Sequence, residues 1–90
     1  MTELSFTKEK NKFVSEFVAN GAFGLEVRGV KGYVGVMMNL SGEGEYCPVK
    51  DSYETGNNIY VKQFGGEVWP VNVKVVCDTE PTYGGYMVSE

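Results

Sequence analysis

The side chains that could do chemistry in this chain are few. The 90 residues contain no histidine, the commonest general base and the commonest zinc ligand. Without it, a Ser-His or Cys-His nucleophile pair is impossible. The two cysteines, Cys47 and Cys77, lie far apart in the sequence and form no CxxC unit. We therefore expect no zinc site and no histidine-dependent catalysis.

Acidic residues offer two weaker possibilities. Glu43 and Glu45 flank Gly44, and a glycoside hydrolase needs two carboxylates placed close together. A nearby polar stretch also gathers oxygen atoms of the kind that Ca²⁺ prefers, without the spacing of an EF-hand; its members are Asp51, Ser52, Glu54, Asn57 and Asn58. Solvated loops and polar turns need the same residue types. We predict no catalytic residue, no cofactor and no metal, and hence a protein that is not an enzyme.

Aromatic residues carry a stronger signal than the acidic ones. Tyrosine and tryptophan are enriched in protein interfaces, where the ring is buried and the polar end finds a partner. Similar rings stack on sugars in lectin-like modules, so protein binding and carbohydrate binding both remain open. The residues concerned are Tyr46, Tyr53, Tyr60, Trp69, Tyr83 and Tyr86.

Charge and hydropathy exclude other classes of partner. The net charge is −4, and lysines cluster only at Lys8, Lys10 and Lys12, which disfavours nucleic-acid binding. No apolar run reaches the ~18 residues of a membrane span, and the N-terminus lacks the apolar core of a signal peptide. We expect a protein made in the cytoplasm, with free thiols rather than a disulfide.

The strand that must organise the fold lies in the longest alternating run, residues 68–78. Val71, Val73, Val75 and Cys77 fall on one side of an extended chain, and Pro70 should stand at the start of the strand. These valines should share one buried surface with other apolar residues. The predicted core is Phe6, Phe13, Phe17, Phe23, Leu25, Val27, Val71, Val73 and Val75.

The first predicted hairpin joins residues 4–8 to residues 13–19 through a turn at Lys10-Asn11. This register pairs Lys8 with Phe13, Phe6 with Ser15, and Leu4 with Phe17.

Further strands are expected at 23–27, 33–40, 45–49 and 59–64, with a short last one at 86–88. Gly35 interrupts one of them and suggests a bulge or a close backbone approach, and Pro48 marks an edge. No helical periodicity is present. The pattern predicts an all-β fold, a small antiparallel β-sandwich or partly open barrel of about seven short strands. Residues 1–90 should form a single domain with an extended C-terminal tail at 79–90.

One predicted strand, Tyr33 to Leu40, is apolar on both faces, so its second face needs a cover. Either the tail packs on its own domain or another chain supplies the cover. In the second case the segment 83–88 could add to a neighbour's sheet edge. The predicted interface is Tyr33, Met37, Met38, Tyr83, Tyr86 and Met87.

Two parts of the sequence resemble small all-β virion proteins of tailed phages of gut bacteria. They are Leu4–Glu9 with Phe13–Phe17, and Trp69–Val76 with Glu80–Thr82; residues 44–58 have no counterpart. The resemblance implies a non-enzymatic, virion-associated auxiliary capsid protein or other small virion component. Its partners would be further copies of itself or a capsid or shell protein, and no catalytic residue is carried over. The alternative is a carbohydrate-binding or adhesion module that uses exposed Tyr and Trp side chains.

Overall fold

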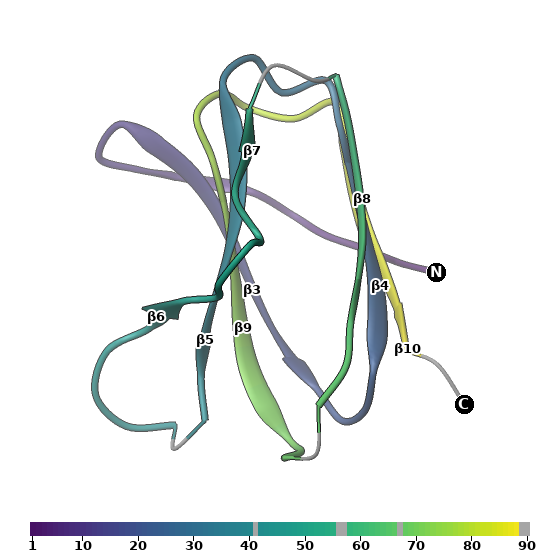
Figure 1. Ribbon diagram of the computed structural model, residues 1–90. Helices are drawn as coiled ribbons and strands as arrows, with labels where there is room; N and C mark the ends of the chain where they lie inside the picture. The colour runs from purple at the N-terminus through teal and green to yellow at the C-terminus, as the bar shows by residue number, and fades with distance from the viewer. Residues whose placement is uncertain (41, 56–57, 67, 89–90) are drawn as a thin grey trace.

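The computed structural model describes residues 1–40, 42–55, 58–66 and 68–88, and within them it contains strands and no helix. Two antiparallel sheets face each other across a shared core (Figure 1). The predicted small antiparallel β-sandwich is therefore confirmed. The strands are β1 (Thr2–Glu3), β2 (Thr7–Glu9), β3 (Lys12–Ala19), β4 (Phe23–Arg28), β5 (Tyr33–Asn39), β6 (Cys47–Pro48), β7 (Glu54–Thr55), β8 (Ile59–Phe64), β9 (Val71–Cys77) and β10 (Tyr83–Val88).

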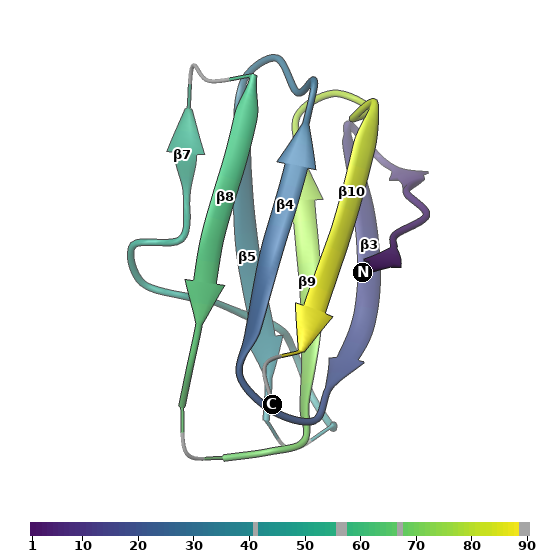
Figure 2. The same ribbon diagram turned by 90° about the vertical axis from the view of Figure 1, so that its right-hand side faces the viewer.

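The strands divide unequally between the sheets. The four-stranded sheet has the order β1-β10-β4-β8, and it faces the viewer in Figure 2. The six-stranded sheet has the order β2-β3-β9-β5-β6, with β7 also paired to β5. The short Pro48 strand, β6, pairs only with β5 and lies at an edge as expected.

The alternating run at 68–78 becomes β9, which lies between β3 and β5. Its inward residues Val71, Val73, Val75 and Cys77 are at most 1 % exposed. Pro70 directly precedes the strand, where its missing N–H interrupts no ladder.

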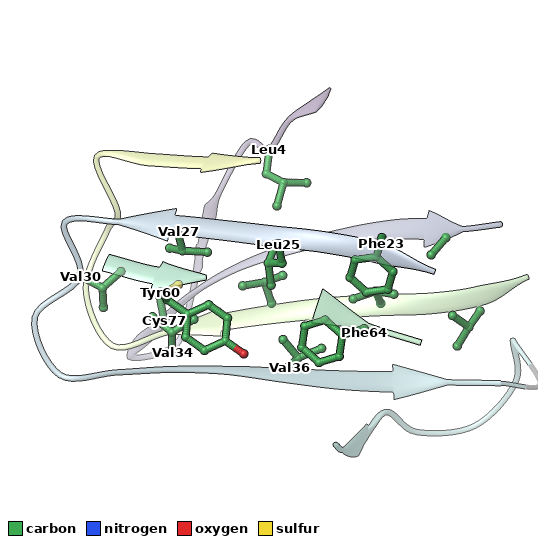
Figure 3. Close-up of a cluster of buried hydrophobic side chains, with 14 residues drawn as sticks. Leu4, Phe23, Leu25, Val27, Val30, Val34, Val36, Tyr60, Phe64 and Cys77 are labelled. Atoms are coloured by element: carbon green, nitrogen blue, oxygen red, sulfur yellow. The ribbon is translucent and has the colours of Figure 1, made fainter. Parts of the chain in front are cut away.

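The core fills the space between the sheets (Figure 3). Phe23, Leu25 and Val27 on β4 are buried as predicted, and the Phe23 ring stacks on Phe64 with 5.1 Å between ring centroids. The remaining predicted members Phe6, Phe13 and Phe17 are only partly buried and pack against the margin of the core.

The N-terminal segment crosses from one sheet to the other. Lys8 pairs with Phe13 as predicted, but the pairing begins only at Thr7. The expected partnerships of Phe6 with Ser15 and of Leu4 with Phe17 are wrong. The Leu4 N–H donates instead to the carbonyl of Gly84, at 2.8 Å, and β1 pairs with β10. The crossing lets Leu4 and Phe6 close one side of the core.

The C-terminal segment contains the short last strand expected at 86–88, which begins earlier than expected, at Tyr83, and lies inside the sheet rather than in an extended tail. Tyr83–Val88 forms β10 between β1 and β4 and pairs with β4 along all six positions. Gly84 admits the Phe6 ring, because a Cβ there would lie 2.5 Å from a ring carbon. Tyr86 stacks on Phe17 with ring centroids 3.9 Å apart. Residues 89 and 90 of the expected tail lie outside the described residues.

Residues 47–55 close the other side of the sandwich. Ser52 is fully buried; its hydroxyl accepts from the Val36 N–H at 3.2 Å and donates to the Val49 carbonyl at 2.8 Å. The Tyr60 hydroxyl donates to the Ser52 carbonyl at 2.7 Å, which links this segment to β8. The next residue, Tyr53, lays its ring against Gly35. Of the two alternatives expected at Gly35, the structure shows a close approach, made by this ring, and the register with β9 contains no bulge there.

Candidate functional site

The outer surface of the four-stranded sheet is built from three strands in strict register. Alternate residues of β10, β4 and β8 point away from the core and line up in rows across the sheet. The rows are Met87–Gly24–Gln63, Gly85–Glu26–Val61 and Tyr83–Arg28–Ile59. We call this surface, together with Met1, the open face.

Apolar side chains of the open face are exposed to solvent. Val61 is 64 % exposed and Met87 is 57 % exposed, and Met1 and Ile59 are similarly uncovered. Gly24 leaves the sheet bare between them, because a Cβ at this position would have no neighbour within 4 Å. The result is an open hollow of about 610 Å³ above Gly24, lined on its sides mainly by Met1, Met87, Val61 and Gln63.

Two opposite charges lie at the centre of the open face. Glu26 and Arg28 are successive outward residues of β4, and the Arg28 Nε donates to the Glu26 carboxylate. Tyr83 stands beside them, and its hydroxyl donates to the Met1 sulfur at 3.1 Å. The open face therefore combines exposed apolar groups at its sides with one ion pair at its middle.

The outer surface of the six-stranded sheet, the covered face, is different. The Lys74 ammonium on β9 lies 3.1 Å from the Glu9 carboxylate on β2 and 5.6 Å from the centre of the Tyr46 ring. The Tyr46 hydroxyl donates to Glu16 on β3 at 2.8 Å. Partial burial, together with this carboxylate, raises the pKa of Tyr46 to about 12. Tyr46 thus spans the sheet from the segment before β6.

A second cluster covers the other end of the same face. The Lys12 ammonium lies 2.5 Å from the Asp78 carboxylate and 4.6 Å from the centre of the Tyr33 ring. The hydrogen bond between the Lys12 ammonium and the Asp78 carboxylate raises the pKa of Lys12 and lowers the pKa of Asp78. The rings of Tyr33 and Tyr53 lie 5.6 Å apart. The second apolar side of β5 is therefore covered in part by the chain's own residues.

The structure does not bring the six predicted interface residues together. Tyr83 and Met87 lie on the open face, whereas Tyr33 and Met37 lie on the covered face. Met38 and Tyr86 pack against the core. Of the six, only Tyr83 and Met87, both on β10, therefore belong to the open face.

No similar protein was found: no family model, curated protein or solved structure matches this chain.

Apart from Tyr83 and Met87, the residues of the open face were not predicted from the sequence; they include Met1, Gly24, Ile59 and Val61. A signal for two of them was present, because residues 59–64 are apolar on both sides of the strand. Tyr60 and Phe64 take the inner side, which leaves Ile59 and Val61 outside.

The residues considered for chemistry are dispersed. Both thiols are free as predicted; Cys47 is exposed, and burial raises the pKa of Cys77 to about 12. Glu45 is exposed in the loop before β6. Across the described residues, no three acidic, histidine or cysteine side chains come together as a metal site would require.

The polar stretch considered for Ca²⁺ has a structural role in the part that is described. The Ser52 hydroxyl is committed to Val36 and Val49, and Glu54 belongs to β7. Asn57 lies outside the described residues. The described part of the chain also holds no helix with the length and hydropathy of a membrane span.

Proposed function

We propose that this protein is a non-enzymatic structural component, an auxiliary capsid protein or other small virion protein, which docks on a larger protein assembly through its open face. The single observation that carries the proposal is the exposure of Val61, Met87 and Met1 around the bare backbone of Gly24, with Ile59 exposed on the same face beside Arg28.

This surface has the properties of a protein-binding site. The solvent side of an antiparallel sheet normally carries polar residues, and contiguous exposed apolar groups mark sites of interaction. Methionine side chains, here Met1 and Met87, adapt their shape to a partner. Glu26 and Arg28 add a charged centre that restricts the orientation of the partner.

The assignment to a virion is supported by the sequence resemblance. The resembling segments include β2, most of β3 and most of β9, which are framework strands of the six-stranded sheet. The open face is built mainly by β4, β8 and β10, outside those segments. The framework strands thus carry the resemblance on which the virion assignment rests. The open face would form the contact with the larger assembly.

The test uses purified tailed-phage particles from the source community. We expect the chain to be found in them by mass spectrometry at a copy number comparable to the capsid protein, and the purified chain to co-sediment with them. Val61→Glu and Met87→Glu should each abolish co-sedimentation. Val18→Glu is the matched control, because Val18 is an exposed valine on the outward side of β3.

Two results would contradict the proposal: absence of the chain from the particles, or co-sedimentation that Val61→Glu and Met87→Glu leave unchanged. A glycan array provides the decisive contrast. Binding of the monomer to a single sugar class would support the carbohydrate-binding or adhesion module instead. Tyr33 and Tyr53 are the ring pair to substitute in that case.

A further inference from the structure

The middle strand of the open face, β4, carries an acidic side chain in the second row and a basic one in the third. Glu26 lies in the row of Val61, and Arg28 lies in the next row, beside Ile59. Opposite charges in successive rows of one strand form a pattern that can complement itself when a second copy is turned end for end. A twofold interface requires this kind of self-complementary patch.

Two simple twofold arrangements would stack one open face on another. An axis parallel to the strands places Glu26 over Glu26 and Arg28 over Arg28 of the other copy, so that like charges meet. An axis across the strands, passing between these two rows, places Glu26 over Arg28 at two symmetric positions. It also places Val61 over Ile59, so that apolar groups meet. The charge pattern favours the second arrangement.

We infer that the occupant of the open face is a second copy of this chain, stacked face to face about a twofold axis that runs across β4 between Glu26 and Arg28. This inference rests on the proposed function, since it names the protein that the open face binds. The Glu26 and Arg28 rows then form the contact, and the row of Gly24 in each copy, with the hollow above it, lies beyond the Arg28 row of the other copy, so that one hollow flanks each end.

Pairing through the sheet edge is the rival arrangement, and the structure disfavours it. β8 offers a six-residue edge, but Lys62 is paired with Leu25 and so lies on the inner side of that edge. An inward charge on an edge strand opposes the addition of a further strand. β7 pairs with β5 in the other sheet and extends past the β8 edge in the view of Figure 2, in the space that the second sheet of an edge-paired copy would need.

The area of the open face sets the expected strength. The three strands β4, β8 and β10, about 4.8 Å apart and six residues long at about 3.4 Å per residue, give a surface of roughly 300 Å² per copy. Stable complexes bury about 800 Å² per partner. The dimer should therefore be weak in dilute solution, and it becomes important where an assembly holds many copies close together.

The test is a charge exchange across the twofold axis. Sedimentation velocity from micromolar to millimolar concentration should show a reversible monomer–dimer equilibrium. Glu26→Arg alone and Arg28→Glu alone should each weaken the dimer about tenfold, since each places like charges at both contacts. An equimolar mixture of the two variants should restore association, because opposite charges then meet at both contacts.

The control is Lys50→Glu, which makes the same change of net charge as Arg28→Glu at an exposed position outside the open face. It should leave the dimer unchanged, and the thermal midpoint of each variant verifies that it is folded. Failure of the mixture to recover association overturns the proposed axis.

The inference and the proposed function can fail separately. A wild-type chain that stays monomeric at millimolar concentration overturns the second copy as occupant. The proposed function survives that result if Val61→Glu still abolishes co-sedimentation with phage particles. Conversely, a dimer that shows the charge exchange, together with a chain absent from the particles, supports the inference and overturns the virion assignment.

Discussion

The two outer faces of this sandwich differ in how the chain treats outward apolar residues. On the covered face, Val14 and Val76 point away from the core and are nevertheless only 5 % and 8 % exposed. The ion pair between Lys74 and Glu9 reaches over the row that contains Val14. On the open face, Val61 has no comparable cover. The same chain thus covers much of one outer face, where Val18 is the exposed exception at 51 %, and leaves the apolar residues of the other available for contact.

The aromatic part of this cover originates in one segment. Tyr46 and Tyr53, which cover the six-stranded sheet, both come from residues 42–55 between β5 and β8. The described connections beside the open face carry no comparable side chain across it. The segment covers the outer face of one sheet. The outer face of the four-stranded sheet stays exposed, which is compatible with its use as a contact surface.

The largest expected effect contrasts an inner and an outer apolar residue of neighbouring strands. Leu25→Ala should lower the free energy of unfolding by about 2–4 kcal/mol, because it leaves a cavity in the core. Val61→Ala should change it by less than about 0.5 kcal/mol, since the side chain is exposed. Urea denaturation measures both. A large loss in Val61→Ala would mean that the open face serves stability.

A pair of glycine substitutions compares the faces directly. Gly35→Ala should destabilise by about 1–3 kcal/mol, because its Cβ would lie 2.2 Å from the Tyr53 ring. Gly24→Ala should be neutral or stabilising by up to about 1 kcal/mol, because its Cβ meets open space and the unfolded chain loses freedom. Thermal unfolding of both variants checks this. Equal effects would contradict the assignment of cover to one face.

Alkaline pH should reveal the contribution of Tyr46 to the stability of the folded protein. Its pKa is raised from 10.0 to about 12 in the folded protein, so the unfolded chain loses the phenol proton first. The free energy of unfolding should therefore fall as pH rises from about 10 to about 12. Tyr46→Phe should lose less across this window, although the raised pKa values of Tyr60 and Cys77 still act in both proteins. Parallel pH profiles would rule out this contribution.

The smallest expected effect concerns the ion pair of the covered face. Lys74→Met should cost about 0.2–1 kcal/mol at low salt, since Glu9 is largely exposed. The loss should shrink in 1 M NaCl, because screening weakens the pair in the wild type. Denaturation at the two salt concentrations measures the difference. A loss that salt does not change would indicate that packing of the lysine stem matters more than its charge.

The fold was predictable where alternation was strong and failed where it was weak. β9 and β4 present one apolar side each, so their inner faces were recognised from the sequence. Only residues 86–88 of β10 were expected as a strand because Gly84 and Gly85 interrupt the pattern before them, yet those glycines let Phe6 and Met1 pack closely. The crossing at Leu4 was missed because alternation indicates a strand and does not indicate which sheet it joins.

The candidate surface was predictable only in part, for a related reason. Tyr83 and Met87 were expected at an interface and lie on the open face. Met38 and Tyr86 were expected beside them and face the core instead. A strand that is apolar on both sides gives no indication of its inner side. Pairing with neighbours such as β4 and β9 determines which side faces the core. The sequence of the strand alone does not specify that pairing.

The N-terminal crossing has a mechanical consequence. Residues 2–9 tie the two sheets together along one side, through β1 in one layer and β2 in the other. Ser52 ties them along the opposite side, between β5 and β8. Because the two sheets are connected along both sides, they resist sliding over one another. The four-stranded sheet therefore presents a rigid outer surface. A rigid surface loses little conformational entropy when a partner binds to it. Less of the free energy gained from a small contact area is therefore lost to ordering the protein.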